Sequence, residues 1–329
     1  MRVLVTGGAG YIGSHAVRLL ERAGNDVWVY DNLSLGHRAA VPSGHLAEGE
    51  LADRARLIEV LSGQKIEAVM HFAAFAAVGE SVVDPAKYYQ NNVVSSLNLL
   101  EAMRASGVKR IVFSSTTATY GVPERIPITE QEPQKPINPY GFGKLVIEQA
   151  LADYASAYGF AYAALRYFNA AGASPDGDLG EDHTPETHLI PLVLEVALGK
   201  RSEISVFGDD YPTPDGTCIR DYIHVDDLGA AHVLALGKLE SGKGLRLNLG
   251  TGRGNSVREV IEACRKVTGH AIPTKMGPRR AGDPPELVAD SSLAQRVLDW
   301  RPRYTDIESI VRTAWKWHSS HPQGYASRS

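Results

Sequence analysis

The sequence predicts an α/β protein with a doubly wound, Rossmann-type parallel sheet and a smaller C-terminal α/β lobe. Short apolar segments alternate with longer amphipathic segments through the first half of the chain, which is typical of βαβ units. The glycine-rich stretch TGGAGYIG, residues 6–13, directly follows the first apolar segment. After Asn169 the sequence becomes rich in Gly, Pro, Asp and Thr. We interpret this change as the passage from one lobe to another.

Strands and helices are expected in regular alternation. The predicted strands of the sheet are six in number and cover 2–6, 26–30, the stretch around 46–50, 67–73, 109–115 and 161–168. The intervening periodicity predicts helices over 11–23, 53–62, 85–106 and 140–158. Later in the chain we expect helices over 190–199, 226–240, 256–268 and 305–319, and a short strand over 245–250. Two of these helices start with capping-box spacing, Ser256 to Glu259 and Thr305 to Glu308.

Composition argues against several classes of protein. The 329 residues carry 34 Lys plus Arg and 38 Asp plus Glu, a net charge of -4, without a basic block, so no nucleic-acid partner is expected. No apolar run approaches the roughly 18 residues of a membrane span, and Met1 leads straight into a strand, so we expect neither a membrane segment nor a signal peptide, and a cytoplasmic location. Cys218 and Cys264 form no CxxC motif, and the sequence predicts neither a metal site nor a disulfide framework.

The glycines of TGGAGYIG indicate a dinucleotide site. Gly7, Gly10 and Gly13 lie between a predicted strand and a predicted helix, where a pyrophosphate approaches the backbone at a helix N-terminus. Asp31 ends the second strand, where a carboxylate accepts from both hydroxyls of the adenosine ribose. This favours NAD over NADP, because a 2'-phosphate would meet the carboxylate. The alternatives are a glycine turn without a ligand and a capping Asp31, and Arg38 is interpreted as a surface arginine.

The stretch NPYGFGKLVIEQ, residues 138–149, indicates the chemistry. Tyr140 and Lys144 are four residues apart on a predicted helix and therefore share one face. A neighbouring ammonium, together with the positive nicotinamide of NAD⁺, favours the phenolate of a tyrosine. Such pairs also occur on solvated helix faces, so the prediction depends on the hydroxyls of FSSTTATYG as well. These hydroxyls follow a strand at the carboxyl edge of the sheet, where they can complete a Ser/Thr-Tyr-Lys triad.

A series of blocks along nearly the whole chain extends this pattern. They are TGGAGYIGSH, HFAAFAAVGES, YYQNNV, FSSTTATYG, PYGFGK, LRYFNAAGA, FGDDYPTPDGTCIRDYIHVDDL, NLGTGRGNSV and RRAGDPPELVAD. Together they resemble the UDP-galactose 4-epimerases of the extended short-chain dehydrogenase/reductase family. The resemblance implies interconversion of UDP-glucose and UDP-galactose through a 4-keto intermediate, a tightly bound NAD, and a homodimer formed through the helices at 85–106 and 140–158.

The resemblance also implies how the lobes and the catalytic residues are used. Residues 1–173 and about 220–252 would form the NAD-binding lobe, and about 174–219 with 253–329 the UDP-sugar-binding lobe. Tyr140 would remove the proton of the sugar 4-hydroxyl, Thr116 would hydrogen-bond that oxygen, and Lys144 would hold the nicotinamide ribose and lower the pKa of Tyr140.

Two further sets of residues follow from the same resemblance. The implied cofactor-binding residues are Gly7, Gly10, Tyr11, Ile12, Asp31, Asn32, Glu50, Leu51, Phe72, Ala73, Ala74, Asn91, Ser114, Tyr140, Lys144 and Tyr167. The implied substrate-binding residues are Thr116, Asn169, His188, Leu189, Arg220, Arg280, Asp283 and Leu287. Arg220 and Arg280 are the expected diphosphate partners, because a guanidinium pairs with phosphate oxygens through two donors.

Several positions depart from the family pattern. Thr116 occupies a position that is often serine, and Ala76 one that is often a cofactor-contacting lysine, so one cofactor contact is missing. Glu50 stands where the family commonly has aspartate. Leu287 corresponds to the gate of the sugar pocket, where small residues accompany N-acetylhexosamines and bulky ones exclude them. Leucine is intermediate, and we expect UDP-glucose and UDP-galactose as the main pair.

Other functions stay open at this stage. One alternative is a 4-epimerase of a UDP-N-acetylhexosamine, a UDP-pentose or a UDP-uronate. A dehydratase is disfavoured, because residues 117–119 are Thr-Ala-Thr and offer no acid to protonate a leaving hydroxyl. A non-catalytic NAD-binding sensor is disfavoured as well, because Tyr140, Lys144 and Thr116 are all present.

Overall fold

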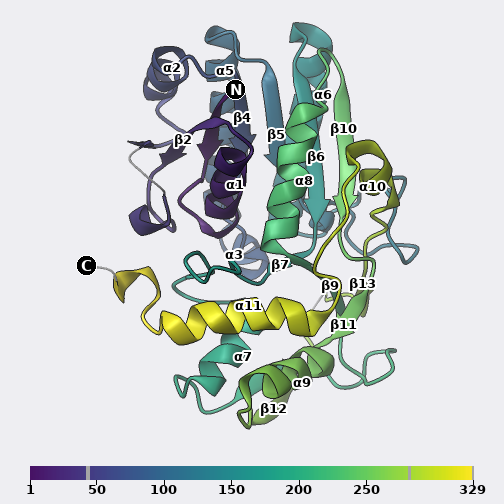
Figure 1. Ribbon diagram of the computed structural model, residues 1–329. Helices are drawn as coiled ribbons and strands as arrows, with labels where there is room; N and C mark the ends of the chain where they lie inside the picture. The colour runs from purple at the N-terminus through teal and green to yellow at the C-terminus, as the bar shows by residue number, and fades with distance from the viewer. Residues whose placement is uncertain (42–44, 281–282, 328–329) are drawn as a thin grey trace.

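The computed structural model describes residues 1–41, 45–280 and 283–327 and confirms the predicted fold class (Figure 1). Its described residues form a seven-stranded sheet in the order β10-β6-β5-β4-β1-β2-β3, in which every pair is parallel. The strands are β1 (Arg2–Thr6), β2 (Asp26–Asp31), β3 (Leu46–Glu48), β4 (Ala68–His71), β5 (Arg110–Ser114), β6 (Ala161–Tyr167) and β10 (Gly244–Leu249). The predicted number of six strands was wrong, because the late strand β10 pairs with β6 and extends the sheet.

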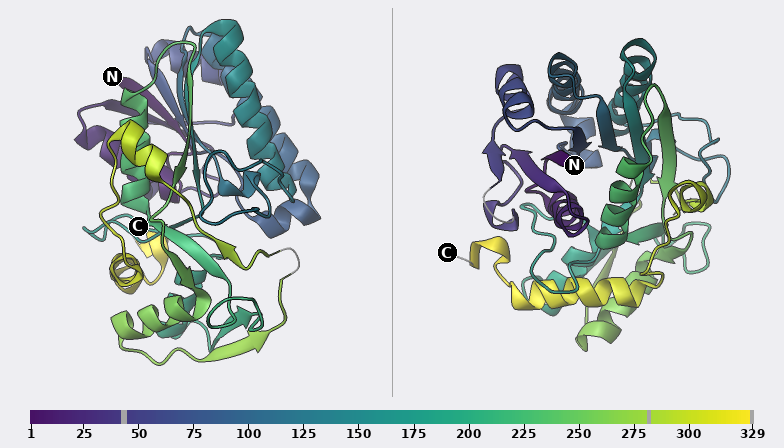
Figure 2. Two further views of the ribbon diagram at one scale, coloured as in Figure 1. Left: turned by 90° about the vertical axis from the view of Figure 1, so that its right-hand side faces the viewer. Right: turned by 45° about the horizontal axis from the view of Figure 1, so that its top comes forward.

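Helices cover both faces of this sheet, as the side view in Figure 2 shows. One face packs against α1 (Tyr11–Arg22), α8 (Val225–Gly237) and α10 (Ser292–Leu298). The other packs against α2 (Arg54–Gly63), α5 (Ser95–Ala105) and α6 (Pro139–Tyr158). Because both faces are covered, the central strands β1, β4, β5 and β6 are almost completely buried.

The predicted helix over 85–106 is interrupted. Its place is taken by the short helix α4 (Pro85–Tyr88), a π-helical turn η2 (Tyr89–Val94) and α5, and the separate helix α3 (Val78–Val83) precedes them. Inside the π turn the buried side chain of Asn92 accepts from the N–H of Phe75 and donates to its carbonyl, both at 2.9 Å. These two bonds fix the segment after β4 against the helix, and π turns of this kind occur frequently at functional sites.

The second lobe lies below the sheet in Figure 1. Its described elements are β7 (Asn169–Ala171), α7 (Leu189–Ala197), β8 (Ile204–Phe207), β9 (Ile219–His224), β11 (Gly254–Ser256), α9 (Val257–Thr268), β12 (Thr274–Gly277), β13 (Glu286–Leu287), α11 (Ile307–Ser320) and the short turn η4 (Gly324–Ser327). Strands β7, β9, β11 and β13 form a small mixed sheet, and β8 pairs with β12. Helices α7, α9 and α11 enclose the core of this lobe. The sequence missed these strands because they are short and lack regular alternation.

One of the two predicted capping boxes is present. At the start of α9 the Ser256 hydroxyl accepts from the N–H of Glu259, whose carboxylate accepts from the N–H of Ser256. The prediction for α11 was wrong by one residue, since its N-cap is Asp306, which accepts from the N–H of Ser309 at 2.8 Å. An aspartate carboxylate directly follows Thr305 and caps the free N–H groups instead.

The chain passes between the lobes several times. It leaves the sheet after β6, enters the lower lobe through β7, returns through β9 and α8 to β10, and then leaves again. Helix α10 and Trp300 lie in the range predicted to belong to the second lobe, yet they pack in the core of the large sheet. Among the described residues, no helix combines the length and the apolar character needed to cross a membrane.

Candidate active site

The glycine loop joins β1 to α1. Gly7 has a positive φ of +72°, and a Cβ there would lie 2.6 Å from the backbone nitrogen of Ala73. A Cβ on Gly13 would lie 2.1 Å from the carbonyl oxygen of Gly7. These two glycines are therefore required by packing of the loop and the helix.

Gly10, unlike Gly7 and Gly13, is not required by packing within the chain. Among the described atoms its Cβ would meet only the Gly7 carbonyl oxygen, at 3.4 Å, so the space beside it is not filled by the chain. Gly10 is also the N-cap of α1, and no described side chain caps this helix. The N-terminus of α1 thus offers uncapped N–H groups beside open space, which fits the pyrophosphate of a dinucleotide.

Asp31 lies at the end of β2, beside the glycine loop. Its carboxylate accepts from the N–H of Ala9 at 3.0 Å and from the N–H of Leu33 at 2.8 Å. Burial raises the pKa of Asp31, and these two hydrogen bonds oppose the rise. Nearby, Asn32 donates to the exposed Glu50 carboxylate at 3.1 Å, which brings two more predicted cofactor residues together.

Other predicted cofactor residues surround the same loop. Phe72 and Ala73 follow β4, and both donate their N–H groups to the carbonyl oxygen of Thr6, at the end of β1. Tyr11 donates its hydroxyl to the carbonyl oxygen of Gly172 at 2.7 Å. Asn91 donates to Asn92 in the π turn at 2.8 Å. The predicted positions Ile12, Leu51 and Ala74 are half-buried next to these residues in the chain. Arg38 forms an exposed pair with Glu48, as expected of a surface arginine.

Thr116 and Tyr140 meet where β5 ends and α6 begins. Thr116 caps the short turn η3 (Thr117–Thr119) and shares a side-chain hydrogen bond with Tyr140. Helix α6 begins after Asn138, whose side chain accepts from the N–H of Gly141 at 2.8 Å. A Cβ on Gly141 would lie 2.5 Å from the carbonyl oxygen of Ala118, so only glycine lets the helix approach this turn. The sequence PYGFGK therefore supplies the close approach as well as the tyrosine.

Lys144 lies one helical turn further along α6 and is buried. Its Nζ donates to the carbonyl oxygen of Ser114 at 2.8 Å and lies 5.9 Å from the centre of the Tyr140 ring. Burial lowers the pKa of Lys144 to about 7, and the charge of Glu148 opposes this. Burial raises the pKa of Tyr140 to about 12, and the hydrogen bond with Thr116 opposes this. In the protein without NAD, the pKa of Tyr140 is therefore raised and not lowered as the sequence predicts.

Tyr167, the last residue of β6, lies beside Ser114. Its hydroxyl shares a 2.6 Å hydrogen bond with the hydroxyl of Ser114. Burial raises the pKa of Tyr167, and the nearby Tyr140 adds to the rise. The predicted residues Ser114, Thr116, Tyr140, Lys144 and Tyr167 thus lie together at the carboxyl ends of β5 and β6.

The predicted substrate residues form a second group on β7, β9, β13 and α7. Asn169 donates to the carbonyl oxygen of Asp221 at 3.4 Å. Arg220 pairs with Asp283 and donates to two backbone carbonyl oxygens, at 2.6 and 2.9 Å. Leu287 lies opposite Arg220 in the register between β13 and β9. The structure thus brings Arg220, Asp283 and Leu287 together.

The remaining substrate predictions lie elsewhere in this lobe. Arg280 is exposed, and its guanidinium carbon lies 4.3 Å from the centre of the Phe207 ring. His188 is the N-cap residue of α7, and Leu189 is the first residue of that helix. Burial lowers the pKa of His188, but the carboxylates of Glu181 and Glu186 outweigh burial and raise it to about 10.

A buried polar network beneath the pocket was missed by the sequence analysis. Glu148 pairs with Arg166 through two bonds of 2.9 and 2.5 Å and accepts from the Ser115 hydroxyl at 2.5 Å. Arg166 also donates to the Tyr120 hydroxyl at 2.7 Å. Glu148 lies four residues after Lys144 on the same helix face, which was the available signal. Ser115 directly follows β5, Arg166 lies in β6, and Tyr120 follows η3. Because these residues are distant from Glu148 in the chain, the sequence could not show the network.

The fold and the glycine loop are those of a dinucleotide-binding enzyme. A family model described as the NAD dependent epimerase/dehydratase family matches residues 3–250. The chain belongs to this family, and NAD is the cofactor that its fold and glycine loop are built to hold.

Individual relatives agree with this assignment over the whole chain. A UDP-glucose 4-epimerase of Lacticaseibacillus casei is 53% identical over 330 residues, covering 100% of both chains. The crystal structure of UDP-glucose 4-epimerase from Brucella ovis in complex with NAD is 55% identical with a TM-score of 0.92, covering 95% of this chain and 97% of that one. The enzyme from Bifidobacterium longum in complex with NAD⁺ and UDP is 40% identical with a TM-score of 0.94, covering 98% and 100%.

Proposed function

We propose that the protein interconverts UDP-glucose and UDP-galactose by inverting the configuration at sugar C4. The observation that carries this proposal is the group of Thr116, Tyr140 and Lys144 at the carboxyl edge of the sheet, beside the uncapped N-terminus of α1. The family of the chain and the names of its relatives support the same reaction.

The chain's own residues would move the proton. Tyr140 would take it from the 4-hydroxyl of the sugar, and Thr116 would hold that oxygen by a hydrogen bond. Bound NAD supplies the acceptor and donor of the C4 hydride, and its positive charge favours the tyrosine phenolate. Lys144 would add a second positive charge near Tyr140 and hold the nicotinamide ribose. After oxidation the 4-keto sugar must turn and present its other face before reduction, and Tyr140 then returns the proton.

The UDP group would anchor the substrate while the sugar turns. We assign this anchor to Asn169, His188, Leu189, Arg220, Arg280 and Asp283. Arg220 is half-buried and already held by Asp283, so a diphosphate would find a guanidinium in a fixed orientation. In this assignment the lobe formed by residues 1–173 and about 220–252 binds NAD, and the remainder binds the UDP-sugar.

The sugar range is proposed from Leu287. This side chain is half-buried opposite Arg220, where it would face the sugar next to the diphosphate. A leucine leaves less room than a small residue would, so we propose UDP-glucose and UDP-galactose as the main pair. UDP-N-acetylhexosamines, UDP-pentoses and UDP-uronates are the competing substrates.

A homodimer is proposed through the region of α3, η2 and α6. Exposed apolar side chains gather on these elements: Val78, Val82, Val83, Tyr89, Val94 and Phe142. Val83, the last residue of α3, is 86% exposed, although its side chain is apolar. Such a surface is typical of a subunit interface. No nucleic-acid or membrane partner is proposed, and a cytoplasmic location stays a prediction from the sequence.

Substrate conversion without added cofactor tests the proposal. The purified protein is incubated separately with UDP-galactose, UDP-N-acetylgalactosamine, UDP-xylose and UDP-galacturonic acid, and the products are separated. We expect conversion of UDP-galactose to UDP-glucose as the fastest reaction, which also requires retained NAD. Faster conversion of another sugar would contradict the assigned pair. Absence of any conversion by protein that releases NAD on denaturation would favour the non-catalytic sensor.

A further inference from the structure

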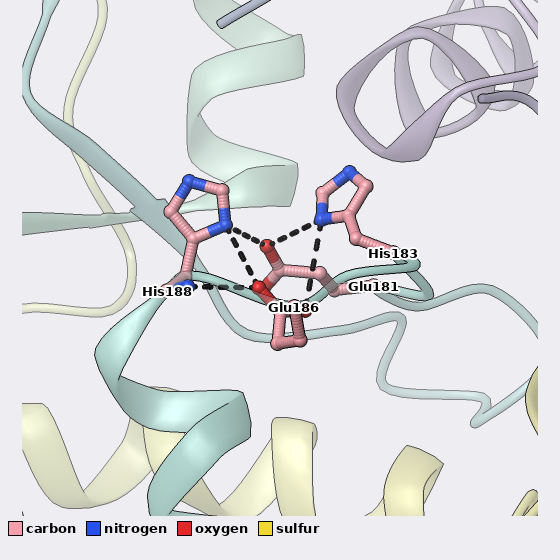
Figure 3. Close-up of side chains that lie close together, drawn as sticks. All are labelled: Glu181, His183, Glu186 and His188. Carbon is pink, nitrogen blue, oxygen red and sulfur yellow. Dashed lines mark hydrogen bonds and ion pairs between the residues drawn. The ribbon is translucent and has the colours of Figure 1, made fainter. Parts of the chain in front are cut away.

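Four ionisable side chains meet in the segment between β7 and α7. Glu181, His183, Glu186 and His188 point toward one another in Figure 3, and we call them the 181–188 cluster. One ligand atom from each, an imidazole nitrogen or a carboxylate oxygen, lies within 4.8 Å of all the others. The Nδ1 atom of His188 lies 2.7 Å from Glu181 and 3.2 Å from Glu186. The Nδ1 atom of His183 lies 3.3 and 3.6 Å from the same two carboxylates.

The carboxylate of Glu181 provides an independent observation. Its side chain is only 4% exposed, and among the described residues its Oε1 atom has the ion-pair contacts with the imidazoles of His183 and His188, at 3.3 and 2.7 Å, but no hydrogen bond of regular geometry. A buried carboxylate oxygen without a hydrogen bond is costly, unless something else binds it. It is directed into the space that both imidazoles also face (Figure 3).

We propose that the 181–188 cluster binds one divalent transition-metal ion, zinc in the first place. The ligands would be Nδ1 of His183 and of His188, and one carboxylate oxygen each from Glu181 and Glu186. Two imidazoles with two carboxylates suit zinc and its first-row neighbours better than magnesium or calcium, which prefer oxygen ligands alone. No metal site was predicted from the sequence, because neither cysteine has the spacing of a metal ligand, and the 181–188 cluster contains no cysteine.

The distances fit such an ion. Zinc binds nitrogen and oxygen at about 2.0–2.2 Å, so the ligand atoms of a tetrahedral site lie roughly 3.3–3.6 Å apart. With Glu181 Oε1 and Glu186 Oε1 as ligands, the nitrogen-oxygen distances of 3.3 and 3.2 Å fall at or near this range, and the 2.7 Å contact of His188 with Glu181 must lengthen. The 3.6 Å contact of His183 is to the other Glu186 oxygen, Oε2. A cavity of about 40 Å³, lined in part by Glu181, His183 and Glu186, adjoins the cluster and has room for a water ligand.

The ion would connect parts of both lobes. The centre of the His183 ring lies 6.3 Å from that of Tyr11, at the start of α1. The carbonyl oxygen of Glu181 accepts from the indole N–H of Trp317 in α11, and His188 is the N-cap residue of α7. The metal is therefore structural in this proposal, and no step of the proposed reaction uses it. The second ring nitrogen of His188 points away from the cluster in Figure 3 and stays available to a substrate.

Metal analysis of the full-length, untagged protein tests the inference. The protein is stripped with a chelator, loaded with zinc chloride, desalted and measured by elemental analysis, and its affinity is determined by competition with a chromophoric chelator. We expect about one zinc per chain. His183→Ala should weaken zinc binding about 100-fold, because it removes one of four ligands. His270→Ala is the matched control, since His270 is exposed and, among the described residues, its hydrogen bonds are to Thr268.

Zinc-edge X-ray absorption on the loaded wild-type protein gives a readout that needs no variant. We expect two imidazole ligands and oxygen ligands at distances typical of zinc. Sulfur ligation would overturn the proposal, because it would assign the ion to a cysteine. Failure of the wild-type protein to retain zinc, or equal affinities of wild type and His183→Ala, would also overturn it. In that case the cluster is a set of ion pairs with protonated histidines, which the nitrogen chemical shifts of the two imidazoles would show.

Discussion

The proposed catalytic site, which we call the pocket, and the 181–188 cluster differ in how the chain assembles them. The pocket takes Thr116, Tyr140 and Lys144 from a strand end and a helix, and a backbone or side-chain hydrogen bond fixes each of them. The cluster takes four ionisable groups from one short segment, and these groups face one another. The pocket therefore takes its geometry from the sheet, whereas the geometry of the cluster depends on what neutralises its charges. Substitutions in the two regions should therefore change different quantities.

The largest expected effect is a loss of turnover without a loss of stability, caused by a substitution at Tyr140. Tyr140→Phe removes the only phenol that shares a hydrogen bond with Thr116 among the described residues, and with it the proposed base. We expect the turnover number to fall about 1,000-fold or more, within the range for loss of a general base. The midpoint of thermal unfolding and the zinc content should not change. Turnover is measured with UDP-galactose in an assay coupled to UDP-glucose.

Tyr158→Phe on the same helix is the matched control for this variant. Tyr158 is 44% exposed at the end of α6, and its turnover should equal that of the wild type. Retention of more than a tenth of the activity by Tyr140→Phe would assign the base to another group.

The second effect concerns the scaffold below the pocket. Glu148→Gln would leave the buried guanidinium of Arg166 without its carboxylate, since both side chains are 2% exposed. Removing one partner of a buried pair costs about 3–5 kcal/mol, so the free energy of unfolding in urea should fall by that amount. Glu240→Gln, which breaks the exposed pair with Lys243, should leave unfolding unchanged. Equal curves for both variants would show that the pocket is not held by this network.

The third effect tests the open space at the glycine loop. Gly10→Ala should reduce NAD affinity about 10-fold or more, because its Cβ would enter the space assigned to the pyrophosphate. The cofactor-free protein should be at least as stable as the wild type, since φ of -81° at this position suits alanine. Gly13→Ala, whose Cβ would meet the Gly7 carbonyl oxygen, should instead destabilise the fold. NAD content and thermal unfolding are measured on both, and normal NAD content in Gly10→Ala would contradict the assigned position.

The smallest effect is expected at Thr116. Thr116→Ser keeps the hydroxyl that accepts from the N–H of Ala118 and shares a hydrogen bond with Tyr140. We expect turnover within about threefold of the wild type, and a loss of about 100-fold for Thr116→Val, which lacks the hydroxyl. Comparable turnover of the serine and valine variants would remove Thr116 from the proposed chemistry.

The sequence signals for the proposed catalytic site are local. Tyr140 and Lys144 lie on one helix, and Gly7, Gly10 and Gly13 lie in one loop, so spacing alone reports their arrangement. The resemblance then named Asn169, Arg220, Asp283 and Leu287, and the structure brings the last three together.

What the sequence could not predict depends on partners that are distant in the chain. The π turn around Asn92 exists because that side chain binds the backbone of Phe75, which no local pattern reports. Glu148 finds Arg166 only after β6 joins the sheet. The 181–188 cluster is local, but its residues lie in a stretch without periodicity. Such a stretch gives no indication of where side chains point.

The position of β10 has a consequence for how the protein is made. This strand completes the large sheet beside β6, and the core on one face of the sheet also contains α8, Ala294, Leu298 and Trp300. During synthesis the ribosome releases β1 to β6 long before these partners emerge. The large sheet therefore waits, with the β6 edge unpaired and one face covered only by α1, until the lower lobe has been translated. A fragment that ends near residue 173 would keep the proposed cofactor residues and the core on one face of the sheet, but it would lack β10, α8 and α10, which complete the core on the other face.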